Sequence, residues 1–186
     1  FPGLPYEPKN QTGSHSVMSL NRVSVFYLFA TALASAAVVG SLTAQFWFQL
    51  DPCPLCIGQR ILYMVAATVL LAGLVNGGVA KMVAGGIGML CGITAAGIGL
   101  YQGWIASEEA LGQCGAPGPY ESTLWWLAEN ISYPVFAPEA SCADAAGHTF
   151  LGLSMPFWSL LSGLVLSLAL LLFFINLGNS AKLTSS

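Results

Sequence analysis

Four long stretches of the sequence contain no charged residue. They cover about residues 23–50, 61–80, 82–107 and 156–177. About 20 apolar residues in a helix cross a hydrocarbon core roughly 30 Å thick. Only 7% of the 186 residues are charged, whereas roughly one quarter are charged in a typical soluble domain. The sequence therefore predicts an all-α membrane protein that folds as a four-transmembrane-helix bundle.

The few charged residues predict how these spans are oriented. Arg22 precedes the first span, Lys81 lies in the predicted turn between the second and third, and Lys182 follows the fourth. Cytoplasmic flanks of spans are enriched in Lys and Arg, so we expect both termini in the cytoplasm. The net charge of −3 gives no reason to expect a nucleic-acid partner. The acidic residues that fall on the opposite, outer side are Asp51, Glu108, Glu109, Glu121, Glu129, Glu139 and Asp144.

The domain limits follow from composition. Residues 1–17 are polar and rich in Pro, Gly and Ser, and we expect them to be a leader outside the fold, with the four-helix domain over residues 18–180. The outer side then carries a short loop, 51–59, and a long one, 108–155. Within the long loop, residues 122–131 contain paired tryptophans, which predict either a short interfacial helix or a small packed loop core.

Small residues recur every four positions in the third span. Ala84, Gly88, Gly92 and Ala96 form one such row. Rows of this kind let helix backbones approach closely in lipid. We interpret them as a packing surface rather than as a cofactor site.

The five cysteines fall into three groups. Cys91 lies within the third span and is expected to act as a small apolar side chain. Cys114 and Cys142 share the long outer loop, where a structural disulfide is one interpretation. Cys53 and Cys56 form a C-x-x-C motif, which is typical of redox chemistry or metal binding.

Arg60 favours the redox interpretation of the C-x-x-C motif. If a helix begins near Leu55, Cys56 lies in its first turn and Arg60 lies four residues later on the same face. The helix N-terminus and the guanidinium then both favour an anionic sulfur. A zinc site formed by all four outer cysteines is the alternative, but a nearby arginine would repel the cation.

A dithiol at the membrane surface needs an electron acceptor. The sequence contains no dinucleotide fingerprint, phosphate-binding loop or haem-attachment motif. A lipid-soluble quinone (ubiquinone or menaquinone) therefore fits best, with Arg60 donating hydrogen bonds to a quinone oxygen. We expect no metal.

Taken together, these motifs resemble the disulfide bond formation protein B (DsbB) family of quinone-dependent membrane thiol oxidoreductases. The resemblance rests on the C-x-x-C at the start of the second span, Arg60, the second cysteine pair and the segment FLGLSMPFW at 150–158. It implies a multi-pass protein of the bacterial inner membrane whose redox loops face the periplasm. It also implies a partner, a periplasmic thioredoxin-fold thiol oxidase similar to DsbA, that is reoxidised by disulfide exchange.

The resemblance also implies roles for the cysteines. The partner would attack the Cys114–Cys142 disulfide at Cys114, Cys142 would then engage Cys53, and Cys56 would pass electrons to the quinone beside Arg60. The chain departs from the family pattern at Pro54 within the motif, at Gln59 where an acid often stands, and in having His148 as its only outer-loop histidine.

Two other functions remain open from the sequence. One is a four-span structural or zinc-binding membrane protein with a permanent loop disulfide. The other is a reductase with reversed electron flow, similar to the vitamin K epoxide reductase group, although there the C-x-x-C motif usually opens a later helix.

Overall fold

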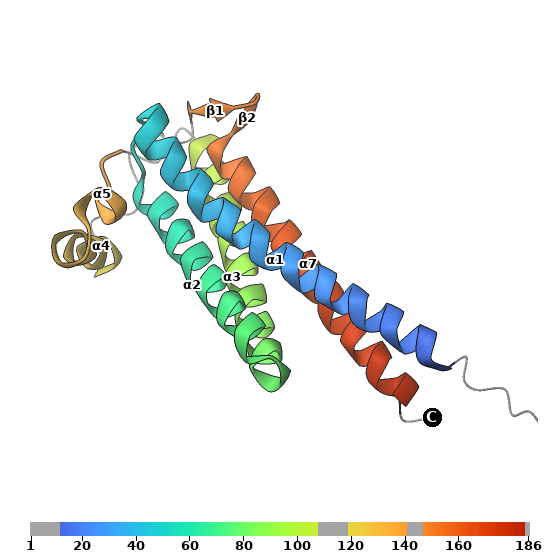
Figure 1. The fold of residues 1–186 in the computed structure, drawn as a ribbon. Helices are drawn as coiled ribbons and strands as arrows, with labels where there is room; N and C mark the ends of the chain where they lie inside the picture. The colour runs from blue at the N-terminus through green and yellow to red at the C-terminus, as the bar shows by residue number, and fades with distance from the viewer. Residues whose placement is uncertain (1–11, 108–118, 141–146, 185–186) are drawn as a thin grey trace, which may run out of the picture.

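Four long helices dominate the structure, a computed structural model that describes residues 12–107, 119–140 and 147–184. Between the third long helix and the fourth, the described residues form two short helices and a two-stranded hairpin (Figure 1). The long helices are α1 (Thr12–Phe48), α2 (Pro54–Asn76), α3 (Gly78–Ser107) and α7 (Met155–Thr184). The shorter elements are α4 (Pro119–Asn130), α5 (Tyr133–Phe136), β1 (Thr149–Phe150) and β2 (Leu153–Ser154).

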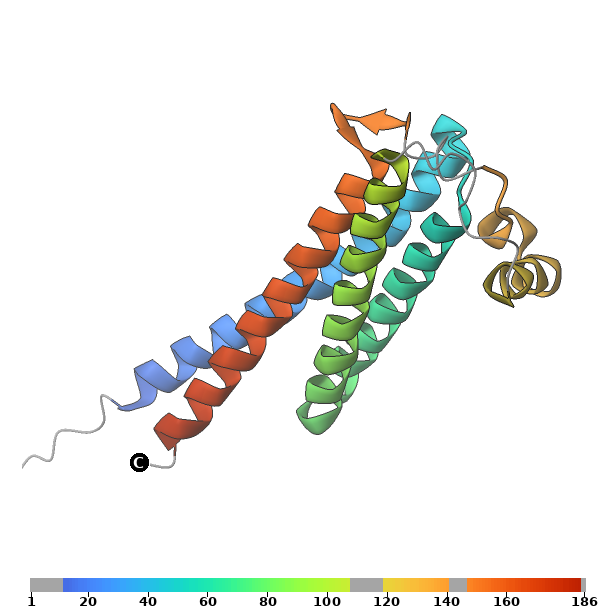
Figure 2. The same ribbon diagram turned by 180° about the vertical axis from the view of Figure 1, so that it is seen from behind.

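The long helices pack side by side as an antiparallel bundle, with α2 against α1 and α3, and α7 against α3 and α1 (Figures 1 and 2). Each contains an apolar segment long enough to cross a membrane. Many large apolar side chains on their outer faces are exposed, including Leu28, Leu90 and Leu164, as expected of surfaces that face lipid. The predicted four-helix membrane bundle is confirmed.

The ends of the helices differ in detail from the sequence expectations. α1 begins at Thr12 and so includes the end of the predicted leader. α2 begins at Pro54, before the apolar stretch, because proline suits the first turn of a helix and the Cys53 side chain accepts a hydrogen bond from the Cys56 N–H. Lys81 lies in the first turn of α3 and not in the connection, which is a single residue, Gly77.

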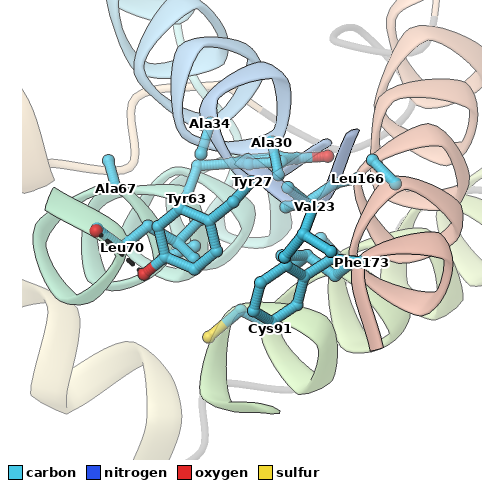
Figure 3. Packing of buried hydrophobic residues seen from close by; sticks show 14 residues of the cluster. Val23, Tyr27, Ala30, Ala34, Tyr63, Ala67, Leu70, Cys91, Leu166 and Phe173 are labelled. Atoms are coloured by element: carbon cyan, nitrogen blue, oxygen red, sulfur yellow. Dashed lines mark hydrogen bonds between the residues drawn. The ribbon is translucent and has the colours of Figure 1, made fainter. Parts of the chain in front are cut away.

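The core lies between all four helices, and Tyr27 is at its centre (Figure 3). The Tyr27 hydroxyl donates a 3.0 Å hydrogen bond to the Leu70 carbonyl. Its ring lies 5.1 Å from that of Phe173 and 4.7 Å from the Lys81 ammonium. The buried tyrosine thus has partners for both its ring and its hydroxyl, and it links α1 to the other three helices.

α3 and α7 approach each other through small residues, as the row in the third span predicts. A methyl group added at Gly163 would lie 2.6 Å from the Gly92 carbonyl oxygen and 2.8 Å from the Ala96 nitrogen. A methyl group at Gly99 would lie 2.8 Å from the Leu160 nitrogen. Only glycine fits at these crossings, because a Cβ would overlap backbone atoms of the neighbouring helix.

The short helices α4 and α5 lie beside the N-terminal end of α2, whereas the β1–β2 hairpin lies beyond the adjoining ends of α3 and α7 (Figures 1 and 2). α4 covers most of the stretch with paired tryptophans; it buries Leu124 and Ala128 and leaves Trp126 exposed. The hairpin turns at Leu151 and Gly152, which both have positive φ (54° and 80°). This is the two-residue turn that matches strand twist, and glycine is the residue that adopts its second position without strain.

Candidate functional site

The C-x-x-C motif forms the N-terminal turn of α2. Cys53 is the N-cap residue, and Cys56 lies in the first turn. Both are free thiols in this structure, and their sulfur atoms lie 2.6 Å apart and share a hydrogen bond. The cap geometry places the two sulfurs side by side, so a small movement converts the dithiol into a disulfide.

The two cysteines differ in accessibility. Cys53 is completely buried, whereas Cys56 is partly exposed and lines a cavity. The hydrogen bond to Cys56, together with burial, raises the pKa of the Cys53 thiol. Cys53 therefore keeps its proton at neutral pH. A soluble protein cannot reach its sulfur in this conformation.

Gln102 on α3 binds both sulfurs. Its amide nitrogen donates to Cys53 Sγ and to Cys56 Sγ, each at 3.3 Å. The side chain is 1% exposed, and its amide oxygen has no hydrogen-bond partner among the described residues. Sequence reasoning missed this residue. The available signal was a lone amide near the outer end of an otherwise apolar span.

Arg60 lies one turn after Cys56 and is 4% exposed. One of its terminal nitrogens, Nη1, donates to Gln45 Oε1 and to the Val135 carbonyl, both at 2.8 Å. The Gln45 amide nitrogen in turn donates a 2.5 Å hydrogen bond to the Pro134 carbonyl. Arg60 and Gln45 thus fasten the α5 turn of the long outer loop to α1 and α2. Arg60 Nε has no hydrogen-bond partner among the described residues.

A cavity of about 670 Å³ lies between α1 and α7 at this end of the bundle. Along α1 it extends from Leu33 to Phe48, about four helical turns. Its walls are mostly apolar, and Cys56, Arg60 and Gln102 line it together. Buried side-chain atoms without a partner among the described residues belong to four of the residues that line it: Gln59 Nε2, Arg60 Nε, Gln102 Oε1 and Ser159 Oγ.

The cavity fits an elongated apolar molecule with polar atoms on its ring, which is the chemistry of a quinone. Its volume lies within the range typical of small-molecule sites. The apolar walls suit an isoprenoid tail, and the unpartnered donors suit ring oxygens. The cavity thus joins the C-x-x-C motif and Arg60 in one site.

The second cysteine pair, Cys114 and Cys142, lies outside the described residues. The chain just before Cys142 is described, however, and it contacts the residue that precedes the first pair. The Glu139 and Ala140 N–H groups donate hydrogen bonds of 3.1 and 3.4 Å to the Pro52 carbonyl. Ala140 precedes Cys142 by two residues, and Pro52 directly precedes Cys53. Within the described ranges, no group of three or more His, Cys, Asp or Glu could hold a metal.

Comparisons with known proteins identify the family of the chain. The chain matches the family described as disulfide bond formation protein DsbB over residues 22–174. It is 38% identical to disulfide bond formation protein B of Chromobacterium violaceum over 136 residues, 71% of this chain and 81% of the relative. It is 33% identical to the protein of that name from Neisseria gonorrhoeae over 147 residues, 75% and 86% of the two chains. The chain therefore belongs to the DsbB family of disulfide bond formation proteins, and this membership implies a membrane disulfide oxidoreductase.

Proposed function

We propose that this protein is a quinone-dependent protein-disulfide oxidoreductase of the bacterial inner membrane. It reoxidises a periplasmic thioredoxin-fold thiol oxidase and passes the electrons to a membrane quinone. The observation that carries this proposal is the shared cavity, because Cys56 of the C-x-x-C motif and Arg60 line the same apolar space. A quinone, when bound there, supplies an acceptor for two electrons and two protons.

The burial of Cys53 supports an exchange route through the chain's own second cysteine pair. A soluble partner cannot reach Cys53 in this conformation, which favours a thiol carried by this chain as the direct electron donor. The contacts of Glu139 and Ala140 with the Pro52 carbonyl favour Cys142 as that thiol.

The proposed exchange balances in atoms and electrons. A partner thiolate attacks Cys114, forms a mixed disulfide and releases the Cys142 thiolate. Cys142 attacks Cys53 of the Cys53–Cys56 disulfide, and the bond that breaks releases Cys56 as a thiolate. The second partner thiol resolves the mixed disulfide and releases Cys114 as a thiolate. Cys114 attacks Cys142 of the Cys142–Cys53 disulfide, which restores the Cys114–Cys142 disulfide and releases Cys53 as a thiolate. The Cys53–Cys56 pair then holds the two electrons from the partner, and a quinone bound beside Cys56 would accept them with two protons as the pair returns to its disulfide.

Arg60 and Gln102 prepare Cys56 for this role. The Gln102 amide donates to the Cys56 sulfur, and such donation stabilises a thiolate. Arg60 provides a positive charge one turn away on the same wall of the cavity. Its unpartnered Nε is a donor for a ring oxygen.

The topology that fits this function places the C-x-x-C motif, the long loop and the hairpin in the periplasm. The charges agree, because Lys81 lies in the first turn of α3, at the far end of α2 from the motif, and Asp51 lies beside the motif. The family membership favours this function over the structural or zinc-binding alternative.

Anaerobic titration with a short-chain ubiquinone tests the proposal. The purified protein, reduced at its cysteines, should form quinol, detected by absorbance, and Cys56→Ser should form none. Cys91→Ser is the matched control, because Cys91 lies in the core away from the cavity, and it should retain the reaction. If the wild type forms no quinol and binds zinc instead, the metal-binding alternative is correct.

A further inference from the structure

A second polar group lies on the cavity wall, one turn further along α2 than Arg60. It consists of Tyr63 on α2 and Ser159 and Ser162 on α7, and we call it the hydroxyl cluster. The Tyr63 hydroxyl lies 2.7 Å from Ser162 Oγ and 3.3 Å from the Ser159 carbonyl oxygen. Ser162 Oγ donates to the same carbonyl at 3.2 Å. All three residues line the cavity.

One hydroxyl group of the hydroxyl cluster, that of Ser159, is a donor without an acceptor among the described residues. The Ser159 carbonyl and Ser162 Oγ accept the available protons of Tyr63 and Ser162. Ser159 Oγ is buried and has no hydrogen-bond partner among the described residues. A buried hydroxyl without a partner is costly, so a hydrogen-bonding group that enters the cavity would gain by meeting it.

Arg60 and the hydroxyl cluster face opposite sides of the cavity. Arg60 reaches toward α1, where it binds Gln45, whereas Tyr63 reaches toward α7. The two residues are three positions apart on α2 and therefore neighbours on one helix face. Three residues rise about 4.5 Å along α2, so the two polar groups are set apart along the cavity wall, as the two opposite oxygens of a 1,4-quinone are set apart across its ring.

We propose that the hydroxyl cluster binds the second ring oxygen of a 1,4-quinone whose first oxygen lies at Arg60 and Cys56. This inference rests on the proposed function, because it assigns a further part of the same cavity. Ser159 Oγ donates its unused proton to the second oxygen. Tyr63 contacts this oxygen too, because Ser162 Oγ can donate to the Tyr63 oxygen or to the Ser159 carbonyl, which leaves the Tyr63 proton for the ligand.

Arg60 and the hydroxyl cluster differ in hydrogen-bonding chemistry, and this difference suits both the quinone and the quinol. A guanidinium only donates hydrogen bonds, whereas a hydroxyl both donates and accepts them. The hydroxyl cluster can therefore donate to the carbonyl oxygen of the quinone and accept from the hydroxyl of the quinol. It selects for ring compounds that carry a second, opposite oxygen.

Equilibrium binding to the unreactive Cys56→Ser protein tests this proposal by calorimetry. The two probes are a short-chain ubiquinone and a phenol with the same ring substituents, which has only one ring oxygen. Tyr63→Phe and Ser159→Ala, each added to Cys56→Ser, should raise the Kd for the quinone about fivefold and leave the Kd for the phenol unchanged. Tyr101→Phe, an exposed tyrosine of α3 outside the cavity, should change neither value.

The outcomes separate this inference from the proposed function. If Cys56→Ser binds the quinone and neither added substitution weakens binding, the hydroxyl cluster does not contact the ligand. If both probes lose affinity equally, the cluster only joins α2 to α7, which also overturns the inference. If Cys56→Ser does not bind the quinone at all, the proposed function fails together with it. Ser159→Ala keeps the test decisive if Tyr63→Phe fails to fold, because Ser159 Oγ makes no bond in the described part of the chain.

Discussion

The two ends of the bundle use polar groups in opposite ways. We call the end that holds the C-x-x-C motif the outer half, and the end that holds Tyr27 and Lys81 the inner half. In the inner half, the hydroxyl of Tyr27 is bound to a backbone carbonyl, and its ring packs against Phe173 and Lys81. In the outer half, Arg60, Gln102 and Ser159 each keep a buried polar atom without a partner among the described residues. Those atoms belong to residues that line a cavity, whereas Tyr27 lies in the packed core.

This contrast indicates where the protein obtains stability and where it places chemistry. Dense packing of small and apolar residues stabilises the inner half and the α3–α7 contact. The outer half is packed less densely because it contains the cavity, and unpartnered polar groups are typical of functional sites. Substitutions in the two halves should therefore change different measured quantities.

The largest effect on activity is expected from Arg60→Met. This change removes the positive charge and the unpartnered Nε from the cavity, and we expect the kcat/KM for the quinone to fall about 100-fold. Steady-state quinol formation at varied ubiquinone concentration measures it. The expectation is wrong if kcat/KM for the thiol oxidase partner falls as much as kcat/KM for the quinone.

Gln45→Ala is the matched variant for Arg60→Met. It removes the hydrogen bonds to Arg60 and to the Pro134 carbonyl but keeps the guanidinium. Gln45→Ala should loosen the α5 turn, seen as faster hydrogen exchange of residues 133–136, and it should reduce quinone reduction much less than Arg60→Met does. Equal losses would mean that Arg60 acts only by fastening the loop.

Gly163→Ala should destabilise the bundle without a direct effect on the cavity chemistry. The added methyl group would overlap the Gly92 carbonyl oxygen and the Ala96 nitrogen, so α3 and α7 must separate at a cost of about 1–3 kcal/mol. Thermal unfolding in detergent should show a lower Tm. Gly97→Ala is the control, because a methyl group there meets no atom within 4 Å, and its Tm should stay equal or rise. A Tm for Gly163→Ala equal to that of the wild type would contradict the close helix contact.

Gln102→Leu should have a smaller effect than Arg60→Met and Gly163→Ala, and the quantity that it changes is a reduction potential. It removes the amide donor from both sulfurs of the reduced pair, which destabilises the reduced form by about 1 kcal/mol. The reduction potential of the Cys53–Cys56 pair should become more negative by roughly 20 mV. Equilibration with glutathione buffers measures the potential.

Gln59→Leu is the control for Gln102→Leu. Gln59 is also buried at the cavity, but the amide that contacts both sulfurs belongs to Gln102. Gln59→Leu should leave the potential unchanged. A shift of the same size in both variants would show that the potential responds to the polarity of the cavity in general.

The sequence by itself determined the membrane spans and the start of the redox helix. Uncharged apolar stretches of 20 or more residues have few alternatives to a membrane helix. The local spacing of Cys53, Cys56 and Arg60 along one helix also follows from sequence, because contacts three or four residues apart depend only on helix geometry. The row from Ala84 to Ala96 likewise predicted a close helix contact before its partner, α7, was known.

The tertiary structure alone decided which distant residues complete the site. Gln102 lies 46 positions from Cys56, and Val135 lies 75 positions from Arg60. The hydroxyl cluster joins residues 99 positions apart, Tyr63 and Ser162. Helix periodicity does not specify which faces of α2, α3 and α7 meet, or at what height, because that depends on how all the side chains pack together. The cavity likewise follows from the arrangement of α1 and α7 around α2, which no single segment of the sequence encodes.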